Sequence, residues 1–284
     1  MMKTYSQLSK DRIDLRKAIP LKQPLALLFE PANLCNMKCP FCYYSDPEFT
    51  PGGLMKWAEF KQIFYDLHDW CAETTYKFKV IRFIGFGEPL INKYTPNMVK
   101  EVRPITQRTE ITTNGTLLTP WLSELLIDAE LDYLRVSIYN QDVTENLKVL
   151  KRLRGDKEYP FIYVKAFDEE KLEPYKDIAD EVALEGRHFW LNDQLGAGVS
   201  PPSVCPQPFK MLSIRYNGDV IVCDPDWKNN TKVGNALETS IKDIWEGEKL
   251  KKFQFMQLLH RRYENASCQT CSFVYNDSYV KDRL

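Results

Sequence analysis

The sequence predicts an α/β fold built from repeated βα units around a parallel sheet, followed by a smaller α+β unit. From about residue 24 to 195, short β-rich runs alternate with amphipathic stretches. Successive runs are about 25 to 30 residues apart, which fits one strand and one helix each. After the Gly/Pro/Ser stretch at 196–203 the pattern becomes shorter and mixed, so we place a boundary there.

Six segments are typical of strands, because each is short, rich in apolar or β-branched residues and bounded by polar or turn residues. They are residues 25–30, 79–85, 109–113, 133–138, 161–167 and 188–192. Between the first two, residues 60–71 carry apolar side chains at i, i+3, i+4 and i+7, which predicts a helix with one buried face. Cys71 lies on that face, and we interpret it as a small buried hydrophobe.

Further helices are predicted where capping residues precede amphipathic stretches, for example Thr119 before Pro120. They cover residues 95–103, 120–129, 142–153 and 171–184. After the boundary, residues 209–223 predict a hairpin with a type I′ turn at Asn217-Gly218. The following stretch, capped by Thr239 or Ser240, predicts one helix. Its expected buried residues are Ile241, Ile244 and Trp245.

Composition excludes several classes of protein. Apolar residues make up 44% of the 284 residues and charged residues 27%, which is typical of a folded globular chain. The net charge is −1 and basic residues are scattered, so nucleic acid is not an expected partner. The apolar runs are far shorter than the roughly 18 residues of a membrane span. The charged N-terminus lacks the apolar stretch of a secretory signal, so we expect a cytoplasmic protein.

Seven of the eight cysteines fall into two groups, which in a reducing compartment indicates metal binding or catalysis. The first group, Cys35, Cys39 and Cys42, has the spacing C-x3-C-x2-C and can turn inward onto one metal centre. A structural zinc ion needs four ligands, and the three histidines are not placed in the sequence to supply one. An iron–sulfur cluster also normally takes four cysteines, so three leave one iron open to a substrate or cofactor.

These cysteines stand in "CNMKCPFC", which resembles the cluster motif of the radical S-adenosylmethionine (SAM) enzymes, with an aromatic residue before the third cysteine. Three further segments resemble that family in order and spacing. They are "FIGFGEPL" after the second strand, "TTNGT" after the third and "RVSIYN" on the fourth. The resemblance implies a partial (βα)6 barrel over residues 24–197, preceded by an N-terminal segment, 1–23, with ligands at the carboxyl ends of the strands.

The resemblance also implies cofactors and their contacts. Cys35, Cys39 and Cys42 would hold a [4Fe–4S] cluster, and SAM would bind at its open iron. One-electron reduction of SAM would give a 5′-deoxyadenosyl radical that abstracts hydrogen from a substrate. The expected cofactor-binding residues are Phe41, Gly85, Gly87, Glu88, Thr113, Asn114 and Ser137.

The second group consists of Cys205, Cys223, Cys268 and Cys271, and its spacing fits zinc and an iron–sulfur cluster equally well. The surrounding sequence resembles the SPASM extension of radical SAM enzymes, in its abbreviated form called twitch. This resemblance implies an auxiliary domain over residues 198–284 with one [4Fe–4S] cluster bound by all four cysteines. A closed cluster would accept or relay an electron, or only brace the fold. The cysteine spacing is most similar to that of twitch enzymes that dehydrogenate 2-deoxy-scyllo-inosamine.

Three functions remain open from the sequence. The first is radical oxidation of a carbinol, or epimerisation, in a small polar metabolite such as a sugar or aminocyclitol. The second is modification of a ribosomally made peptide, although the 24 residues before the first strand are too few for a leader-binding domain. The third is a zinc-binding module without catalysis. For an enzyme we expect an external one-electron donor such as a flavodoxin or ferredoxin. The candidate catalytic residues are Lys165, His188 and Asp193.

Overall fold

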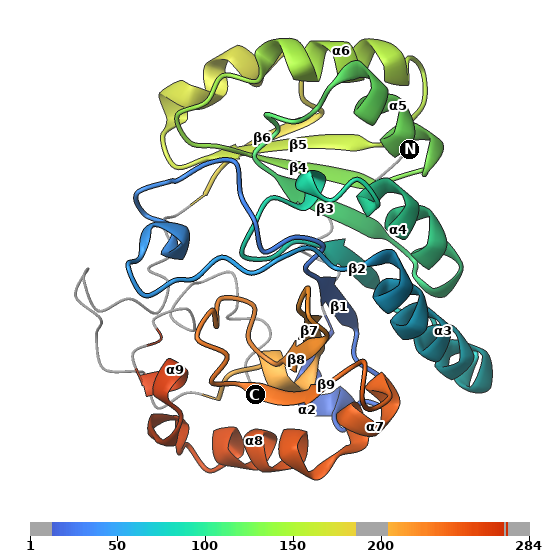
Figure 1. Cartoon of the computed structure of the whole chain (residues 1–284), viewed down its shortest axis with the longest axis vertical. Helices are drawn as coiled ribbons and strands as arrows, with labels where there is room; N and C mark the ends of the chain where they lie inside the picture. The colour runs from blue at the N-terminus through green and yellow to red at the C-terminus, as the bar shows by residue number, and fades with distance from the viewer. Residues whose placement is uncertain (1–12, 186–203, 270, 272–284) are drawn as a thin grey trace.

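The computed structural model describes residues 13–185, 204–269 and 271, and the strands of this part form one open sheet (Figure 1). Its order is β6-β5-β4-β3-β2-β1-β7-β8-β9. The strands are β1 (Ala26–Phe29), β2 (Val80–Phe83), β3 (Thr109–Thr113), β4 (Tyr133–Ile138), β5 (Phe161–Ala166), β6 (Glu181–Leu184), β7 (Met211–Ile214), β8 (Asp219–Ile221) and β9 (Lys232–Asn235). The expected first five strands are therefore confirmed.

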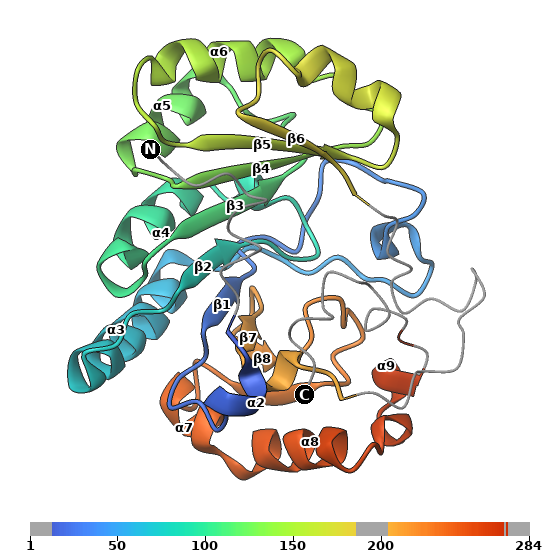
Figure 2. The same cartoon turned by 180° about the vertical axis from the view of Figure 1, so that it is seen from behind.

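Strands β1 to β6 are parallel, and β7 continues the sheet by pairing parallel with β1, whereas β8 and β9 are antiparallel. The C-terminal part of the chain thus extends the same sheet (Figures 1 and 2). The predicted boundary after residue 197 lies outside the described residues.

Helices cover one face of the parallel strands (Figures 1 and 2). The α-helices are α2 (Leu15–Ala18), α3 (Trp57–Thr74), α4 (Thr95–Val102), α5 (Pro120–Asp128), α6 (Thr144–Arg154), α7 (Ile241–Glu246), α8 (Glu248–Leu258) and α9 (Ala266–Gln269). Short 3-10 helices are η1 (Tyr43–Ser45), η2 (Pro89–Ile91), η3 (Arg103–Ile105), η4 (Glu169–Tyr175), η6 (Gln207–Phe209) and η7 (Arg262–Glu264). Cys71 is buried in the core on α3, as expected.

Alternate residues of the parallel strands form an apolar outer face beneath these helices, since side chains of a strand alternate between its two faces. Phe29, Phe83, Ile111, Val136 and Val164, for example, are buried in one core cluster with the helices. The alternate positions therefore point to the opposite face, which we call the inner face.

The prediction for residues 171–184 is wrong. This segment forms η4 and then strand β6, not one α-helix. Pro174 inside η4 removes a backbone donor, which limits a longer helix. Asp180 then fixes the start of β6, because its carboxylate accepts from the Ile162 N–H and pairs with the Arg154 guanidinium. The strand predicted at 188–192 lies outside the described residues.

Two local predictions in the C-terminal part need correction. The β7–β8 hairpin does not have a type I′ turn, because only Gly218 of the Asn217-Gly218 pair has positive φ, at 83°. The Gly218 N–H donates to the Arg215 carbonyl and the Arg215 N–H to the Asp219 carbonyl, as in a type I turn followed by a bulge. The helix predicted after Ser240 is two helices, α7 and α8, that meet at Gly247. Ile241, Ile244 and Trp245 are buried as expected.

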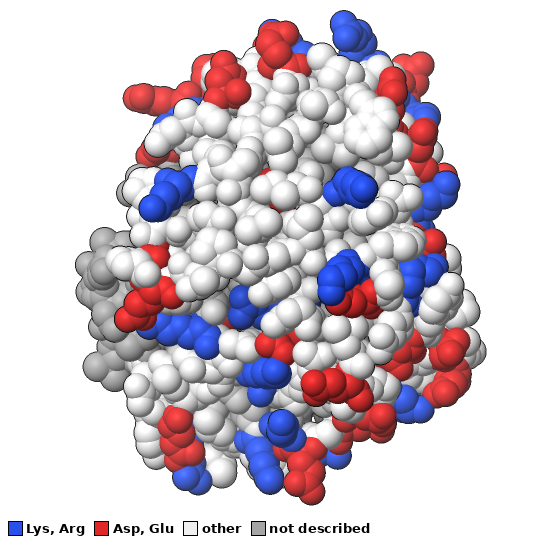
Figure 3. All heavy atoms as spheres, in the orientation of Figure 1, with Lys and Arg blue, Asp and Glu red and all other residues white. Residues whose placement is uncertain are grey.

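Charges of both signs are interspersed on the face of the molecule shown in Figure 3. This distribution agrees with the net charge of −1, and it offers no broad basic surface on that face.

Candidate active site

The inner face of the parallel strands carries a row of charged and polar side chains. Strand register places Arg82 of β2 opposite Glu110 of β3, and Ser137 of β4 opposite Lys165 of β5. Arg135 lies on the same face of β4, two residues before Ser137. A polar inner face beside an apolar outer face indicates that this side of the sheet is built to bind a polar molecule.

Among these charged residues, Glu110 is paired with two arginines. It is fully buried and accepts from Arg82 Nε and Arg108 Nε, each at 2.7 Å. Burial alone would raise the pKa of the Glu110 carboxyl, but Arg82, Arg108 and Arg135 together hold it at about 2. Glu110 is therefore a fixed anion that holds the neighbouring guanidinium groups in place.

Lys165 forms an ion pair with Glu185, just beyond β6, and Arg135 Nη2 lies 4.0 Å from the same carboxylate. Burial and the like charge of Arg135 lower the pKa of Lys165 to about 8, against the opposing effect of Glu185. Of the three candidate catalytic residues, Lys165 thus lies on the inner face, whereas His188 and Asp193 lie outside the described residues.

Asp224 brings a carboxylate from the C-terminal part to this charged group. Burial raises its pKa to about 6, with Glu30 acting in the same direction and Arg82, Arg135 and Lys165 acting against it. Within the described part of the chain, Asp224 has no hydrogen bond or ion pair. It is therefore a carboxylate available to a ligand among the inner-face cations.

The amino ends of the strands are closed by aromatic side chains. Tyr133, Phe161 and Tyr163 form a separate buried cluster on the inner face. The Arg135 guanidinium lies 5.8 Å from the centre of the Tyr163 ring, in a cation–π contact. The polar group is consequently sealed on one side and approached from the carboxyl ends of the strands.

The loop that follows β1 carries Cys35, Cys39 and Cys42 at this carboxyl end. The Met37 N–H donates to Cys35 Sγ at 3.4 Å, and the Tyr44 N–H donates to Cys42 Sγ at 3.5 Å. Burial raises the pKa of Cys42 to about 11, and the negative charges of Cys39 and Cys35 act in the same direction. The three thiols are therefore close enough for their charges to interact, and a cationic centre would favour all three as thiolates.

Phe41, just before the third cysteine of this loop, packs on two aromatic residues that follow strands. Its ring centre lies 4.7 Å from that of Tyr139, after β4, and 5.2 Å from that of Phe167, after β5. The loop is thereby fixed over the ends of these two strands.

The glycine segment after β2 packs tightly against the chain that leads into the cysteine loop. A Cβ atom on Gly87 would lie 2.3 Å from the Leu34 carbonyl oxygen, and one on Gly85 would lie 2.4 Å from Glu30 Cγ. The Glu88 N–H donates to the Leu34 carbonyl at 2.8 Å. Both glycines are therefore required for close approach rather than for positive φ.

Glu88 is buried and connects β2 to the end of β3. Its carboxylate accepts from Thr113 Oγ1 at 2.7 Å and from the Asn114 N–H at 2.8 Å. Asn114 Nδ2 in turn donates to Asn36 Oδ1, inside the cysteine loop, at 2.9 Å. The residues expected to contact a cofactor are thus joined to one another and to the loop. Burial raises the pKa of Glu88, and these hydrogen bonds oppose that rise.

The four cysteines of the second group meet in the C-terminal part. Burial raises the pKa of Cys223 well above its ordinary value, and the charges of Cys271, Cys205 and Cys268 act in the same direction. Gln257 Nε2 donates to Cys268 Sγ at 3.8 Å. The described residues contain no group of three or more His, Cys, Asp or Glu side chains arranged for a single metal ion. Four interacting thiols that are not arranged for a single ion fit a larger iron–sulfur cluster better than tetrahedral zinc.

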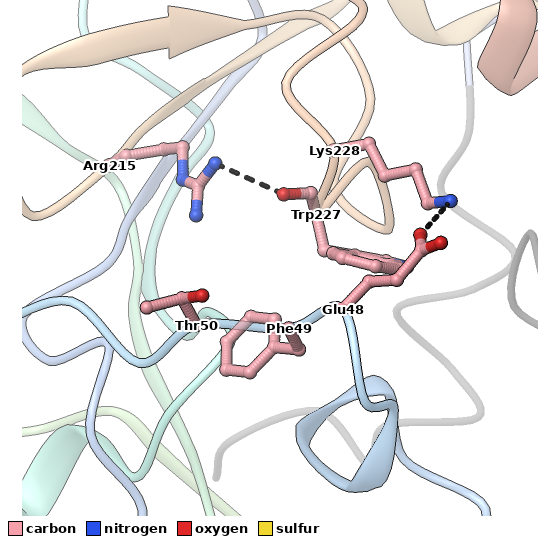
Figure 4. A pocket seen from close by; sticks show the side chains of 6 residues that line it. All are labelled: Glu48, Phe49, Thr50, Arg215, Trp227 and Lys228. Atoms are coloured by element: carbon pink, nitrogen blue, oxygen red, sulfur yellow. Dashed lines mark hydrogen bonds and ion pairs between the residues drawn. The ribbon is translucent and has the colours of Figure 1, made fainter.

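A hollow of about 430 Å³ lies where the segment after the cysteine loop meets the C-terminal part (Figure 4). Glu48, Phe49 and Thr50 line it from one side, and Arg215, Trp227 and Lys228 from the other. Lys228 Nζ donates to Glu48 Oε2 at 2.8 Å across this junction (Figure 4).

Comparisons with known proteins agree with this geometry. Residues 29–169 match the family model of the radical SAM superfamily, and residues 205–272 match an iron-sulfur cluster-binding domain, SPASM. The chain is 31% identical to the tungsten-containing aldehyde ferredoxin oxidoreductase cofactor-modifying protein of Pyrococcus furiosus, over 90% of this chain and 89% of that protein. The chain belongs to the radical SAM superfamily. Membership makes it an enzyme that uses SAM and a [4Fe–4S] cluster, and its SPASM domain implies an auxiliary iron–sulfur cluster.

Further relatives and a solved structure support the fold class of this radical SAM enzyme. It is 26% identical to the SAM-dependent 2-deoxy-scyllo-inosamine dehydrogenase of Niallia circulans, over 84% of this chain and 89% of that protein. A crystal structure of BtrN in complex with AdoMet and 2-DOIA matches with a TM-score of 0.66 and 21% identity, over 91% and 98% of the two chains. The chain spans 30% of the length of the SAM-dependent nucleotide dehydratase of Lacinutrix mariniflava, which it matches at 30% identity over 56% of its own residues. The predicted fold class is confirmed.

No helix in the described part of this radical SAM enzyme is both long and apolar enough to cross a membrane.

Sequence reasoning missed several residues of the site. Tyr139 directly follows a predicted strand and Phe167 ends another, and these positions were usable signals. Glu30 was not identified either, although it is the last residue of the first predicted strand. Asp224 directly follows Cys223, a predicted cluster ligand, and this position could have identified it as a site residue. Arg135 lay inside an expected strand with nothing in the sequence to show which face it occupies.

Proposed function

We propose that this radical SAM enzyme oxidises a carbinol in a small polar metabolite of the sugar or aminocyclitol type, with epimerisation as the related alternative. The observation that carries the proposal is the polar inner face, with Asp224 among cations and with aromatic residues closing the amino ends of the strands. Such a space suits a compact hydroxylated molecule, because several polar groups can meet charged partners there.

We assign the cofactor sites as follows. Cys35, Cys39 and Cys42 hold the cluster that binds SAM, and Cys205, Cys223, Cys268 and Cys271 hold the auxiliary cluster. The residues proposed to contact SAM are Phe41, Gly85, Gly87, Glu88, Thr113, Asn114 and Ser137. When bound, these groups supply hydrogen-atom abstraction from a carbon and an acceptor for one electron.

The chain's own residues have complementary tasks. Oxidation of a carbinol removes one hydrogen atom from carbon, one proton from oxygen and one electron. We assign the proton to the Asp224 carboxylate, since no described residue occupies it. Lys165 and Arg135 orient the substrate oxygens by charge. His188 and Asp193 remain candidates for the same proton transfer.

The activity of one relative supports a small substrate, because that protein is a 2-deoxy-scyllo-inosamine dehydrogenase. Peptide modification is the second candidate, since a PqqA peptide cyclase of Granulibacter bethesdensis is 31% identical over 48% of this chain. For either reaction we propose a flavodoxin or ferredoxin as electron donor and the reducing cytoplasm as the location.

The test of the reaction is anaerobic turnover with SAM, a chemical reductant and carbinol substrates deuterated at the reacting carbon. We expect deuterium in the released 5′-deoxyadenosine and a carbonyl product that hydrazine traps. Asp224→Asn should retain cleavage of SAM but form the carbonyl product about 100-fold more slowly. Asp243→Asn, on α7, serves as the matched control. Turnover of peptides alone, or equal rates for Asp224→Asn and the control, would contradict the proposal.

Iron counting tests the ligand assignment separately. The reconstituted chain should hold about eight irons, for two four-iron clusters. Replacing Cys205 by alanine should reduce this number to about four, whereas Cys71→Ala should leave it unchanged. An unchanged count in Cys205→Ala would refute the auxiliary ligand set.

A further inference from the structure

We propose that Gln257 and Arg262 are positioning residues of the auxiliary site that raise the reduction potential of the bound cluster and so make it an electron acceptor. This inference rests on the proposed auxiliary ligands, Cys205, Cys223, Cys268 and Cys271. It goes beyond that assignment, because a cluster that only braces the fold needs no adjustment of its potential.

Gln257 bridges two of these cysteines. Its Nε2 donates to Cys268 Sγ at 3.8 Å, and its Oε1 accepts from the Cys205 N–H at 3.3 Å. The side chain is fully buried on α8, and it lies on the same face of the helix as the buried Leu250. Packing alone would be satisfied by a leucine at 257, since burying an amide costs free energy unless it is hydrogen-bonded. The amide is therefore explained by its contact with the ligands.

Arg262 adds a positive charge beside the same two cysteines. It follows α8 in η7 and is only 2% exposed. Its positive charge acts on both Cys205 and Cys268. Gln257 thus favours negative charge on the Cys268 sulfur, and Arg262 favours it on both Cys268 and Cys205.

A reduced cluster carries one more negative charge than the oxidised cluster. Hydrogen bonds to the cysteine sulfurs and nearby positive charge stabilise the reduced form more, which raises the reduction potential. The direction of the effect is therefore toward accepting the electron that a substrate radical gives up.

A different buried residue, Asp226, holds the segments around the auxiliary site together. The buried Asp226 carboxylate accepts from Ser267 Oγ at 2.6 Å and from Thr231 Oγ1 at 2.8 Å. These bonds tie the loop after Cys223 to α9, which carries Cys268. The negative charge of Asp226 acts on Cys223 and is opposite in sign to the charge that Arg262 places near Cys205 and Cys268.

The test isolates the auxiliary cluster in the full-length chain with Cys35, Cys39 and Cys42 replaced by alanine. Midpoint potentials are measured by redox titration with electron paramagnetic resonance for Gln257→Leu and Arg262→Gln. Gln254→Leu is the matched control, because Gln254 lies on the same helix but donates to the Pro208 carbonyl. Arg261→Gln is the second control, since Arg261 is exposed and pairs with Glu264.

We expect each test variant to lower the ratio of reduced to oxidised cluster at least tenfold at a fixed potential, a shift of about 59 mV for one electron. The controls should keep the parent value. The parent chain with ¹⁵N in its glutamine side chains should also show a nitrogen hyperfine coupling to the reduced cluster. This measurement does not depend on whether a variant folds.

Two outcomes would overturn the inference, and they are distinguishable. Four irons bound with the same potential in test and control variants, or no nitrogen coupling, would refute the inference alone. A triple-alanine chain that binds no iron would refute the proposed ligand set and the inference with it.

Discussion

Glu110 lies between two arginines on the inner face, and its charge state links this site to the stability of the fold. Its folded-state pKa of about 2 lies below the ordinary value of 4.5. The ionised carboxylate therefore stabilises the folded chain fully above about pH 4.5. That stabilisation decreases as the pH falls from about 4.5 toward about 2.

Glu110→Gln should lower the free energy of unfolding by about 3 kcal/mol at neutral pH, because it leaves Arg82 and Arg108 without their anion. Urea unfolding, read by tryptophan fluorescence at about pH 7, 5 and 3, measures the difference, which should shrink only at the lowest pH. Glu101→Gln is the control, since it removes a partly exposed surface pair with Lys61 and should cost less than about 1 kcal/mol. Equal losses in the two variants would contradict this account.

At the scale of elements, the segment between β2 and η2 holds the cysteine loop in place through backbone contact. Gly87→Ala should push this segment away from Leu34, because the new Cβ has no room beside that carbonyl oxygen. We expect SAM affinity to fall at least tenfold, about 1.4 kcal/mol of binding free energy. Calorimetric titration of SAM into the reconstituted enzyme measures this.

Gly53→Ala provides the control for that prediction. Its new Cβ would lie 3.5 Å from the Tyr216 ring, an ordinary contact. SAM affinity should be unchanged there. Equal affinity in Gly87→Ala and Gly53→Ala would show that the close approach is not needed.

Elements with a strong local pattern could be predicted from the sequence, and those that depend on distant partners could not. Residues 109–113 and 133–138 are observed as β3 and β4 with the expected bounds. Strand β6 was missed because its half-exposed "EVAL" is only four residues long, and it is fixed by Asp180 contacts with earlier elements. The type I′ turn was wrong because Asn217-Gly218 is compatible with more than one hairpin turn.

The same limit applies to the site. Cysteine spacing is a local signal, and within each of the two groups the thiols lie near enough to interact. Contacts such as Glu30 with Arg215 depend on β7 lying beside β1. No local sequence pattern predicts that pairing. Charges on the inner face also depend on which side of each strand meets the helices.

At the scale of the whole molecule, the two regions matched by family models share one sheet. Ala26 to Phe29 of β1 pair in parallel register with Met211 to Ile214 of β7. The buried Glu30 carboxylate accepts from the Arg215 side chain and the Tyr216 N–H. Trp245 Nε1 donates to the Leu21 carbonyl at 3.0 Å. The C-terminal part is therefore a structural requirement of the barrel as well as a cluster site.

A chain that ends at residue 203 should consequently fail to fold. It would leave β1 as an unpaired edge and Glu30 as a buried charge without Arg215, which costs about 3–5 kcal/mol. This loss is a large part of the about 5–15 kcal/mol that stabilises a typical domain. Solubility and circular dichroism of the truncated chain measure the outcome, and we expect aggregation.

The informative control is the full chain cut by a protease at a site inserted within residues 196–203. The cut breaks one covalent connection but keeps the β1–β7 pairing, the Glu30–Arg215 contact and the core packing. We therefore expect the two pieces to co-purify and to retain both clusters after reconstitution. Separation of the pieces without denaturant, or a soluble truncated chain that binds SAM with full affinity, would show that the barrel and the auxiliary part are independent domains. Co-purification together with a truncated chain that aggregates would instead mean that the shared sheet, rather than the connecting segment, makes the two parts one folding unit.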